Sequence, residues 1–233
     1  MSLELGTLPA FADVPAGLLP AGPDGVPVPT AGFRLGVVPV SAGQYWASLV
    51  DRGLQGRAAL LLHAFPVGPG LGLRAAPAGA VALDEDSAHL PATGVSWRGA
   101  SAYCEWLTAR TGVPCRLPTA AEWQYAAAGP AGFRWSLGDE FDRGTYAPPA
   151  SSPRPVGGTP ANAFGLRDMT GNVFEWCADP LLAPTGAELG SRVIKGGAYT
   201  VRNPESFENA TVFTADELST LPYIGFRVLS TGS

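Results

Sequence analysis

The two strongest helix signals in this chain follow one another directly. In the first, VSWRGASAYCEWLTARTG at residues 95–112, Ser96 is placed to cap a helix and Gly112 to end it. In the second, LPTAAEWQYAAAG at residues 117–129, Thr119 and Glu122 stand three residues apart as in a capping box, and Gly129 ends the helix. Apolar residues of the first helix share one face at helical spacing: Ala100, Tyr103, Cys104 and Leu107.

The sequence after Phe133 lacks a helical period. Proline and glycine recur from Gly138 to Gly171, which favours loops and short strands. Ahead of the helices, residues 32–41 predict a strand that ends at Ser41, the cap of a short helix, and residues 79–83 predict another short strand. This order of elements predicts an α+β domain.

The N-terminal residues differ from the rest in composition. Residues 1–30 hold six prolines and little periodicity, so we expect a proline-rich arm over 1–31 and one domain over 32–233. No basic region precedes the first apolar residues, as it would in a signal peptide. No stretch approaches the roughly 18 apolar residues of a membrane span, so we expect no membrane insertion.

Charge and cysteine content indicate which classes of partner and which redox compartment to expect. The formal net charge of −5 argues against nucleic acid as a partner, because phosphate binding needs a basic stripe. Three cysteines, Cys104, Cys115 and Cys177, are too few and too scattered for a disulfide framework. We therefore expect a reduced setting, cytoplasmic or associated with a phage particle. The sequence does not specify an oligomeric state.

The C-terminal segment, residues 194–229, is regular only at its ends. IKGG and IGFRVL alternate apolar positions as strands do, whereas the residues between them keep no helical or strand period. This middle part contains no Cys, His or Lys, yet it carries several aromatic residues. A long loop held at both ends suits the display of side chains from a rigid base.

Three stretches together carry a resemblance to a known family. They are GVSWRGASAYCEWLTARTGVPCRLPTAAEWQYAAAG, then NAFGLRDMTGNVFEWCAD, then RVIKGGAY with GFRVL near the end. Their order and spacing resemble the formylglycine-generating-enzyme (sulfatase-modifying factor) domain family over about residues 32–229. The resemblance implies a C-type-lectin-like fold, with two helices, a small twisted antiparallel sheet and much irregular loop. It does not fix the function, because this scaffold hosts oxidases, sulfoxide synthases and ligand binders.

The residues that those chemistries need are missing. The resemblance implies that oxidases of the family hold copper with a cysteine pair between RGG and GFR, and residues 198–223 contain no cysteine. Cys104, Cys115 and Cys177 read as packed residues. Sulfoxide synthases of the family use three histidines, and this chain has only His63 and His89. We therefore predict that the chain is not an enzyme.

GNVFEW offers a candidate calcium site. The resemblance implies that side chains of this motif, with nearby carbonyl oxygens, hold calcium, and here those side chains are Asn172 and Glu175. The alternative is a framework role, in which Asn172 caps a turn and Glu175 pairs with an arginine. Trp123 and Trp176 are expected in the core. No other cofactor is expected.

The predicted function is ligand binding through the C-terminal loop region. The resemblance is greatest to the variable proteins of diversity-generating retroelements, whose C-terminal codons are rewritten at adenines. The runs YTVRN, VFT and LPY hold only residues that altered asparagine codons can encode, whereas Glu205, Glu208 and Glu217 would be fixed. The partner would be a protein or a glycan. The predicted contact residues are Tyr199, Thr200, Val201, Arg202, Asn203, Phe207, Val212, Phe213, Thr214, Asp216, Leu221, Pro222 and Tyr223. The alternative is a catalytically altered or accessory formylglycine-generating-type domain that acts on a peptide.

Overall fold

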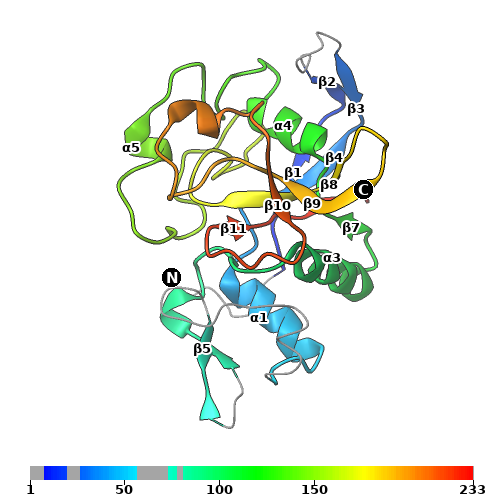
Figure 1. Cartoon of the computed structure of the whole chain (residues 1–233), viewed down its shortest axis with the longest axis vertical. Coiled ribbons are helices and arrows are strands. Elements are labelled where there is room, and N and C mark those ends of the chain that lie inside the picture. The colour runs from blue at the N-terminus through cyan, green and yellow to red at the C-terminus, as the bar shows by residue number, and fades with distance from the viewer. Residues whose placement is uncertain (1–7, 20–26, 57–72, 78–80, 233) are drawn as a thin grey trace.

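The computed structural model describes residues 8–19, 27–56, 73–77 and 81–232 (Figure 1). The first half holds β1 (Phe11–Val14), β2 (Gly17–Leu19), β3 (Val28–Thr30), β4 (Phe33–Gly36), α1 (Ala42–Asp51), β5 (Leu73–Ala75), β6 (Val81–Leu83), η2 (Glu85–Ser87), α3 (Trp97–Thr111), β7 (Cys115–Arg116) and α4 (Ala120–Ala128). The second half holds α5 (Arg143–Tyr146), β8 (Phe174–Leu182), β9 (Glu188–Lys195), η3 (Pro204–Phe207), β10 (Phe213–Asp216), β11 (Ile224–Gly225) and β12 (Leu229–Ser230).

The described strands form two four-stranded sheets and two hairpins. One sheet has the order β1-β4-β12-β7 and the other β10-β9-β8-β11. The C-terminal strands join both, because β11 pairs with β8 and β12 pairs with β4 and β7. The α+β, C-type-lectin-like fold predicted from the sequence is confirmed. The sequence did not reveal the division into two sheets or the parallel pairing of β11 with β8.

Both strong helix signals form helices at the predicted boundaries. The Ser96 hydroxyl accepts a hydrogen bond from the Gly99 N–H at the start of α3, and Gly112 ends α3 with a φ of 73°. In α4 the capping box of Thr119 and Glu122 is complete, with Gly129 at the C-terminal end. Ser41 likewise caps α1, in a capping box with Gln44. The local side-chain pattern therefore sets these helix ends.

The segment assigned to an arm contains strands that the sequence did not predict. β1 pairs with β4 in antiparallel register, with Phe11 opposite Gly36, and Val14 and Leu19 are buried. The strand predicted over 32–41 is observed only over Phe33–Gly36. Of the strand predicted over 79–83, residues 79 and 80 lie outside the described residues, and Val81–Leu83 form β6. Short strands of three or four residues leave too few alternations for a sequence pattern to detect.

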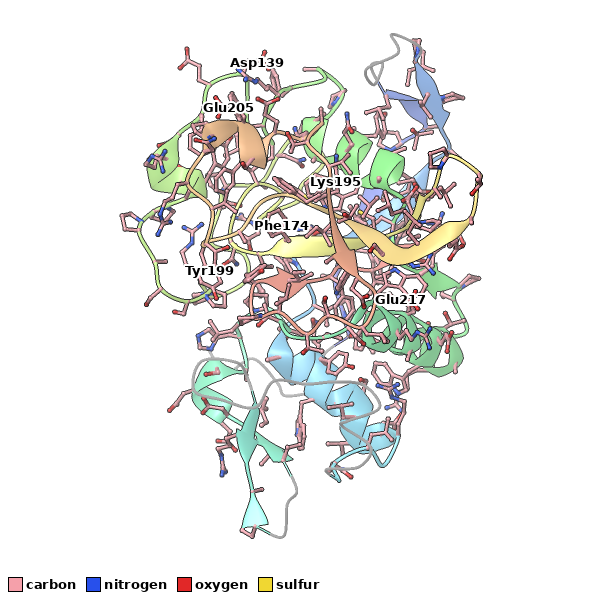
Figure 2. The ribbon with its side chains drawn as sticks, in the orientation of Figure 1. Asp139, Phe174, Lys195, Tyr199, Glu205 and Glu217 are labelled. Atoms are coloured by element: carbon pink, nitrogen blue, oxygen red, sulfur yellow. The ribbon has the colours of Figure 1, made fainter. Side chains whose placement is uncertain are left out.

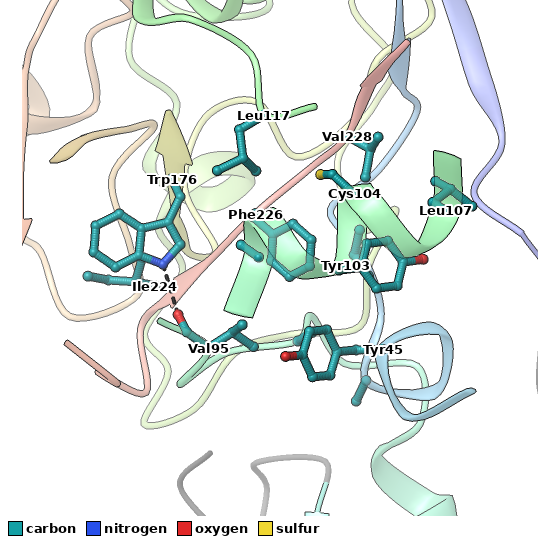
Figure 3. Close-up of a cluster of buried hydrophobic side chains, with 14 of the residues drawn as sticks. Tyr45, Val95, Tyr103, Cys104, Leu107, Leu117, Trp176, Ile224, Phe226 and Val228 are labelled. Atoms are coloured by element: carbon teal, nitrogen blue, oxygen red, sulfur yellow. Dashed lines mark hydrogen bonds between the residues drawn. The ribbon is translucent and has the colours of Figure 1, made fainter. Parts of the chain in front are cut away.

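The main core lies between α1, α3 and the C-terminal strands (Figure 3). Tyr45 and Tyr103 stack with ring centroids 5.8 Å apart, and Phe226 packs edge-on against both. Trp176 is fully buried and its indole N–H donates to the Val95 carbonyl at 2.8 Å. All four residues of the predicted apolar face of α3 are buried, as is Trp123. Within the described part of the chain, no helix has the length and apolar character needed to cross a membrane.

Candidate ligand-binding surface

The base of the C-terminal loop region is a buried ion pair between Glu175 of β8 and Arg227. The Arg227 guanidinium donates to both carboxylate oxygens of Glu175 at 2.6 Å, and the Trp123 indole N–H donates to Oε2 at 2.7 Å. Arg227 also donates to the backbone carbonyls of Gly36 at 2.9 Å and Arg167 at 3.0 Å. One side chain thereby joins the C-terminus to β4, β8 and the loop before β8.

These contacts do not fit a calcium site at Glu175. A calcium ion there would need carboxylate oxygens that are free to coordinate it. Both oxygens of Glu175 already accept hydrogen bonds, and the group beside them is a guanidinium cation. Among the described residues, no cluster of three or more His, Cys, Asp and Glu could hold a metal ion. Glu175 therefore has the framework contacts that the sequence analysis gave as its alternative role.

Asn172 likewise has its side chain engaged by the protein. Its φ of 66° places it in the left-handed region, which asparagine tolerates better than most residues. The side-chain oxygen accepts from the Arg154 N–H at 2.8 Å, and the side-chain amide donates to the Arg154 carbonyl at 3.1 Å. Its backbone carbonyl accepts from the Tyr199 N–H at 2.9 Å. Asn172 therefore positions the start of the C-terminal loop region.

Phe207 corrects the predicted contact set. It is fully buried in a small cluster with Trp135, Tyr146 and Ala147, and its ring lies 5.3 Å from that of Phe141. It also lies against Gly197, which has a φ of 78° and no room for a side chain. The prediction that Phe207 binds a ligand is therefore wrong, because the ring fills the space beneath the loop. Its neighbours in sequence gave no periodicity from which this burial could be predicted.

The other predicted residues reach the surface to different degrees. Val212 is 53% exposed and Phe213 is 37% exposed. The exposed members are Thr200, Arg202, Asn203, Val212, Phe213, Thr214 and Asp216. The half-buried members are Tyr199, Val201, Leu221, Pro222 and Tyr223. We call these twelve residues the loop surface.

Three hydrogen-bonded anchors and one strand hold the loop surface in place. The Asn209 N–H donates to the Arg134 carbonyl at 2.8 Å, and the Asn209 side chain donates to the Phe133 carbonyl at 2.9 Å. The Trp97 and Gly94 N–H groups donate to the carbonyls of Glu217 and Leu221. β10 pairs with β9 in antiparallel register. The segment thus contains a strand, β10, that the sequence analysis missed.

An aromatic platform supports part of the loop surface, and Phe174 is its centre. The buried Phe174 ring lies edge-on to Phe213 at 5.3 Å and to Tyr223 at 6.4 Å. The Tyr199 hydroxyl donates to the Pro222 carbonyl at 3.5 Å. Sequence analysis did not assign Phe174 to this surface. The signal was its place beside Glu175 on a strand, because neighbouring strand residues point to opposite faces.

Burial disfavours ionisation of all three cysteine thiols. Cys104 and Cys177 are buried, and burial raises the pKa of both thiols. Cys115 is partly buried, and burial also raises its pKa. A raised pKa disfavours the thiolate, which is the nucleophile and metal ligand. His63 lies outside the described residues.

Lys195 is the only lysine of the chain and its side chain is fully buried. The ammonium lies 5.9 Å from the centre of the Trp123 ring and donates to the Gln124 side chain at 3.4 Å. Burial lowers the pKa of Lys195 from 10.5 to about 8. A buried ammonium costs stability, because the unfolded chain solvates it fully.

The stability of the parent should rise as the pH increases from about 8 to 10.5. We predict that replacing Lys195 with methionine abolishes this rise. In that range folded Lys195 is neutral while the unfolded chain still binds the proton, so stability rises with pH. Below pH 8 the full cost of the buried charge is present, about 3 kcal/mol for this pKa difference. K195M should therefore gain stability over the parent near pH 7 and lose that advantage near pH 10.

Denaturant titration of both proteins at the two pH values measures this. The relevant quantity is the difference between the parent and K195M, because Tyr45 and the buried Cys104 thiol affect the high-pH behaviour of both proteins. A constant difference across the pH range would contradict the prediction.

The chain matches one protein family over almost its whole length. The family is the sulfatase-modifying factor enzyme 1-like domain, and the match covers residues 7–231. The chain belongs to this family.

Three curated relatives are 31% to 37% identical to the chain within the matched stretches. A serine/threonine-protein kinase pkn1 of Chlamydia caviae is 37% identical over 52% of this chain and 21% of its own length. A formylglycine-generating enzyme of Streptomyces coelicolor is 36% identical over 47% of this chain and 42% of its own. An inactive C-alpha-formylglycine-generating enzyme 2 of Mus musculus is 31% identical over 58% of this chain and 42% of its own. The matches thus span less than half of each relative.

Solved structures confirm the fold. CarF is similar with a TM-score of 0.72 and 22% identity, over 96% of this chain and 98% of that one. Treponema denticola variable protein 1 is similar with a TM-score of 0.73 and 18% identity, over 94% of each chain. At these identities the likeness concerns the fold alone.

Proposed function

We propose that this chain is a non-catalytic binding module whose loop surface contacts a macromolecular ligand. The observation that carries the proposal is the contrast within the C-terminal loop region. Its backbone is held by Asn172, Asn209 and the pairing of β10 with β9, while seven of the predicted contact side chains are exposed. A surface that is already ordered loses little conformational entropy on binding.

The chemistry of the region supports binding rather than oxidation. Residues 198–223 lack the cysteines that the oxidases of the family need, and the cysteines elsewhere are packed with raised thiol pKa values. Membership in a family that includes a protein named as inactive is consistent with this proposal. Copper-dependent conversion of a cysteine in a sulfatase-motif peptide to formylglycine would contradict it.

Diversification of the codons for these residues would make the loop surface a variable binding surface. The runs YTVRN, VFT and LPY supply all but one of its residues, and each run holds only residues that asparagine codons altered at adenines can encode. The likeness to a variable protein is compatible with this idea. An adjacent reverse transcriptase gene and a near-copy of the 3′ end of this gene would support it, and their absence from the locus would oppose it.

The proposal predicts that exposed positions of the loop surface tolerate substitution together. In a displayed library that randomises Thr200, Arg202, Asn203, Val212 and Thr214, most members should fold, because exposed substitutions usually change stability by about 0.5 kcal/mol or less. A conformation-sensitive protease-resistance readout measures the folded share. Selection on one immobilised target protein should then enrich binders.

A matched library at buried positions of the same region provides the control. Randomising Phe207, Ile224, Phe226 and Val228, which are all buried, should leave few folded members. Equal folded shares in both libraries would show that exposure does not confer tolerance. A well-folded first library that yields no binder to any of several targets would oppose the binding function.

A further inference from the structure

Hydrogen bonds to backbone groups connect three arginines at the edge of the loop surface. The Arg143 guanidinium donates to the Arg202 carbonyl at 2.9 Å, and the Arg202 guanidinium donates to the Tyr199 carbonyl at 2.9 Å. The Arg154 guanidinium donates to the Thr145 carbonyl at 3.1 Å, and Thr145 belongs to α5 as Arg143 does. Asn172 bonds the backbones of both Arg154 and Tyr199. These hydrogen bonds link the three arginines around Tyr199.

The three arginines have no carboxylate partner among the described residues. Ion pairs within 4.0 Å occur elsewhere, at Arg34, Arg98, Arg110, Arg116, Arg134, Arg192 and Arg227. Asp142, the acidic residue next to Arg143, accepts from the Gly144 N–H at 2.9 Å and from the Thr145 hydroxyl at 2.6 Å. Those bonds lower the pKa of Asp142 and keep its carboxylate at the start of α5. Among the described residues, therefore, no carboxylate lies within ion-pair distance of these three guanidinium groups, although the chain has a net charge of −5.

The exposure of the three arginines leaves several of their N–H groups able to donate hydrogen bonds to a ligand. Arg143 and Arg202 are exposed, and Arg154 is half-buried. Each guanidinium has five N–H donors, of which the backbone carbonyls occupy a minority. The carbonyl contacts also restrict the side chains, which lowers the entropic cost of binding. α5 and Tyr199 lie on the same side of the molecule (Figures 1 and 2).

We infer that these arginines form a binding site for an acidic segment of a protein partner. The inference rests on the proposed function and names the chemistry of its ligand. The planar guanidinium fork matches a carboxylate bidentately. The patch is spread over α5, the segment around Arg154 and the start of the loop surface, which suits a broad contact rather than one small anion. Arginine and tyrosine, which occur together here, are the residues enriched at energetic centres of protein interfaces.

The test measures binding of a fluorescent copolymer of glutamate and tyrosine at low and moderate salt. The parent should bind it, and binding should weaken as salt screens the charges. The triple variant R143Q/R154Q/R202Q should bind at least tenfold more weakly. The control variant R34Q/R74Q/R110Q has the same net charge but changes arginines elsewhere, and it should bind as the parent does. Circular dichroism and thermal melts establish that both variants fold.

Three outcomes would overturn the inference. Equal losses in both triple variants would show that only net charge matters. Tighter binding of a heparin fragment than of the copolymer, lost in R143Q/R154Q/R202Q, would assign the site to sulfated glycans. Absence of copolymer binding to the folded parent would remove the acidic-ligand assignment. If the diversified library still yields target binders in that last case, the proposed function stands without this inference.

Discussion

Replacing Arg227 with leucine should lower the free energy of unfolding by about 3–5 kcal/mol, because the change leaves the Glu175 carboxylate buried and unpaired. Glu175 is 1% exposed and would keep only the Trp123 indole as a partner. The carbonyls of Gly36 and Arg167 would lose their donor as well. Native domains are stable by about 5–15 kcal/mol in total, so this loss is large. Denaturant titration of R227L against the parent measures it.

Two comparisons distinguish the effect of breaking the buried ion pair from the effect of losing any arginine. Arg98→Leu removes a partner of Glu217 at a site where the arginine side chain is 64% exposed, and exposed pairs contribute about 0–1 kcal/mol. The double variant E175L/R227L removes both charges and should be more stable than R227L.

The loss of stability in R227L should be equal with calcium and with a chelator. Stabilisation of the parent by calcium that is lost in E175Q would restore the calcium site at Glu175.

The helices could be predicted from the sequence because their determinants are local. Ser96 and Thr119 bond to backbone groups three residues away, so a short stretch contains the whole signal. The buried pair of Glu175 with Arg227 joins residues 52 positions apart, and a single sequence gives no sign of which arginine would be chosen. The GNVFEW motif therefore indicates that Glu175 can pair with an arginine, but not which arginine.

The sequence indicated that the loop residues are exposed as a group, but it did not separate the exposed residues from the buried ones. The absence of Cys, His and Lys and the presence of several aromatic residues pointed to residues 199–223, and most of those residues do reach the surface. Phe207 and Phe213 nevertheless have opposite environments, one buried and one 37% exposed. The difference comes from Trp135, Phe141 and Tyr146, which approach Phe207 from a distant part of the chain. No property of the loop sequence distinguishes the two phenylalanines.

The same buried ring determines how the loop surface is held. Gly197 precedes the loop with a φ of 78°, and a Cβ added there would lie 2.4 Å from the Phe207 ring. Phe207 can cover the start of the loop only because residue 197 has no side chain. The ordering of Tyr199 and its neighbours therefore depends on a glycine outside the loop surface.

Gly197→Ala should accordingly destabilise the protein by about 2–5 kcal/mol. About 1–2 kcal/mol comes from a left-handed backbone with a Cβ, and about 1–3 kcal/mol from forcing the Phe207 ring out of its site. Gly186→Ala is the matched control, since Gly186 has a φ of 83° and nothing within 4 Å of its added Cβ. Gly186→Ala should lose only the stability that a Cβ on a left-handed backbone costs. Thermal and denaturant unfolding of both variants measure the difference.

A second change at Phe207 tests the mechanism. Phe207→Leu shortens the ring that the new Cβ would meet, so G197A/F207L should lose less stability than the two single changes added together. Amide hydrogen exchange at Tyr199 should quicken in G197A and not in G186A, because only Gly197 supports the start of the loop surface. Equal losses in G197A and G186A, with additive behaviour in the double variant, would show that Phe207 moves aside freely. The loop surface would then be held by Asn172, Asn209 and β10 without the buried ring.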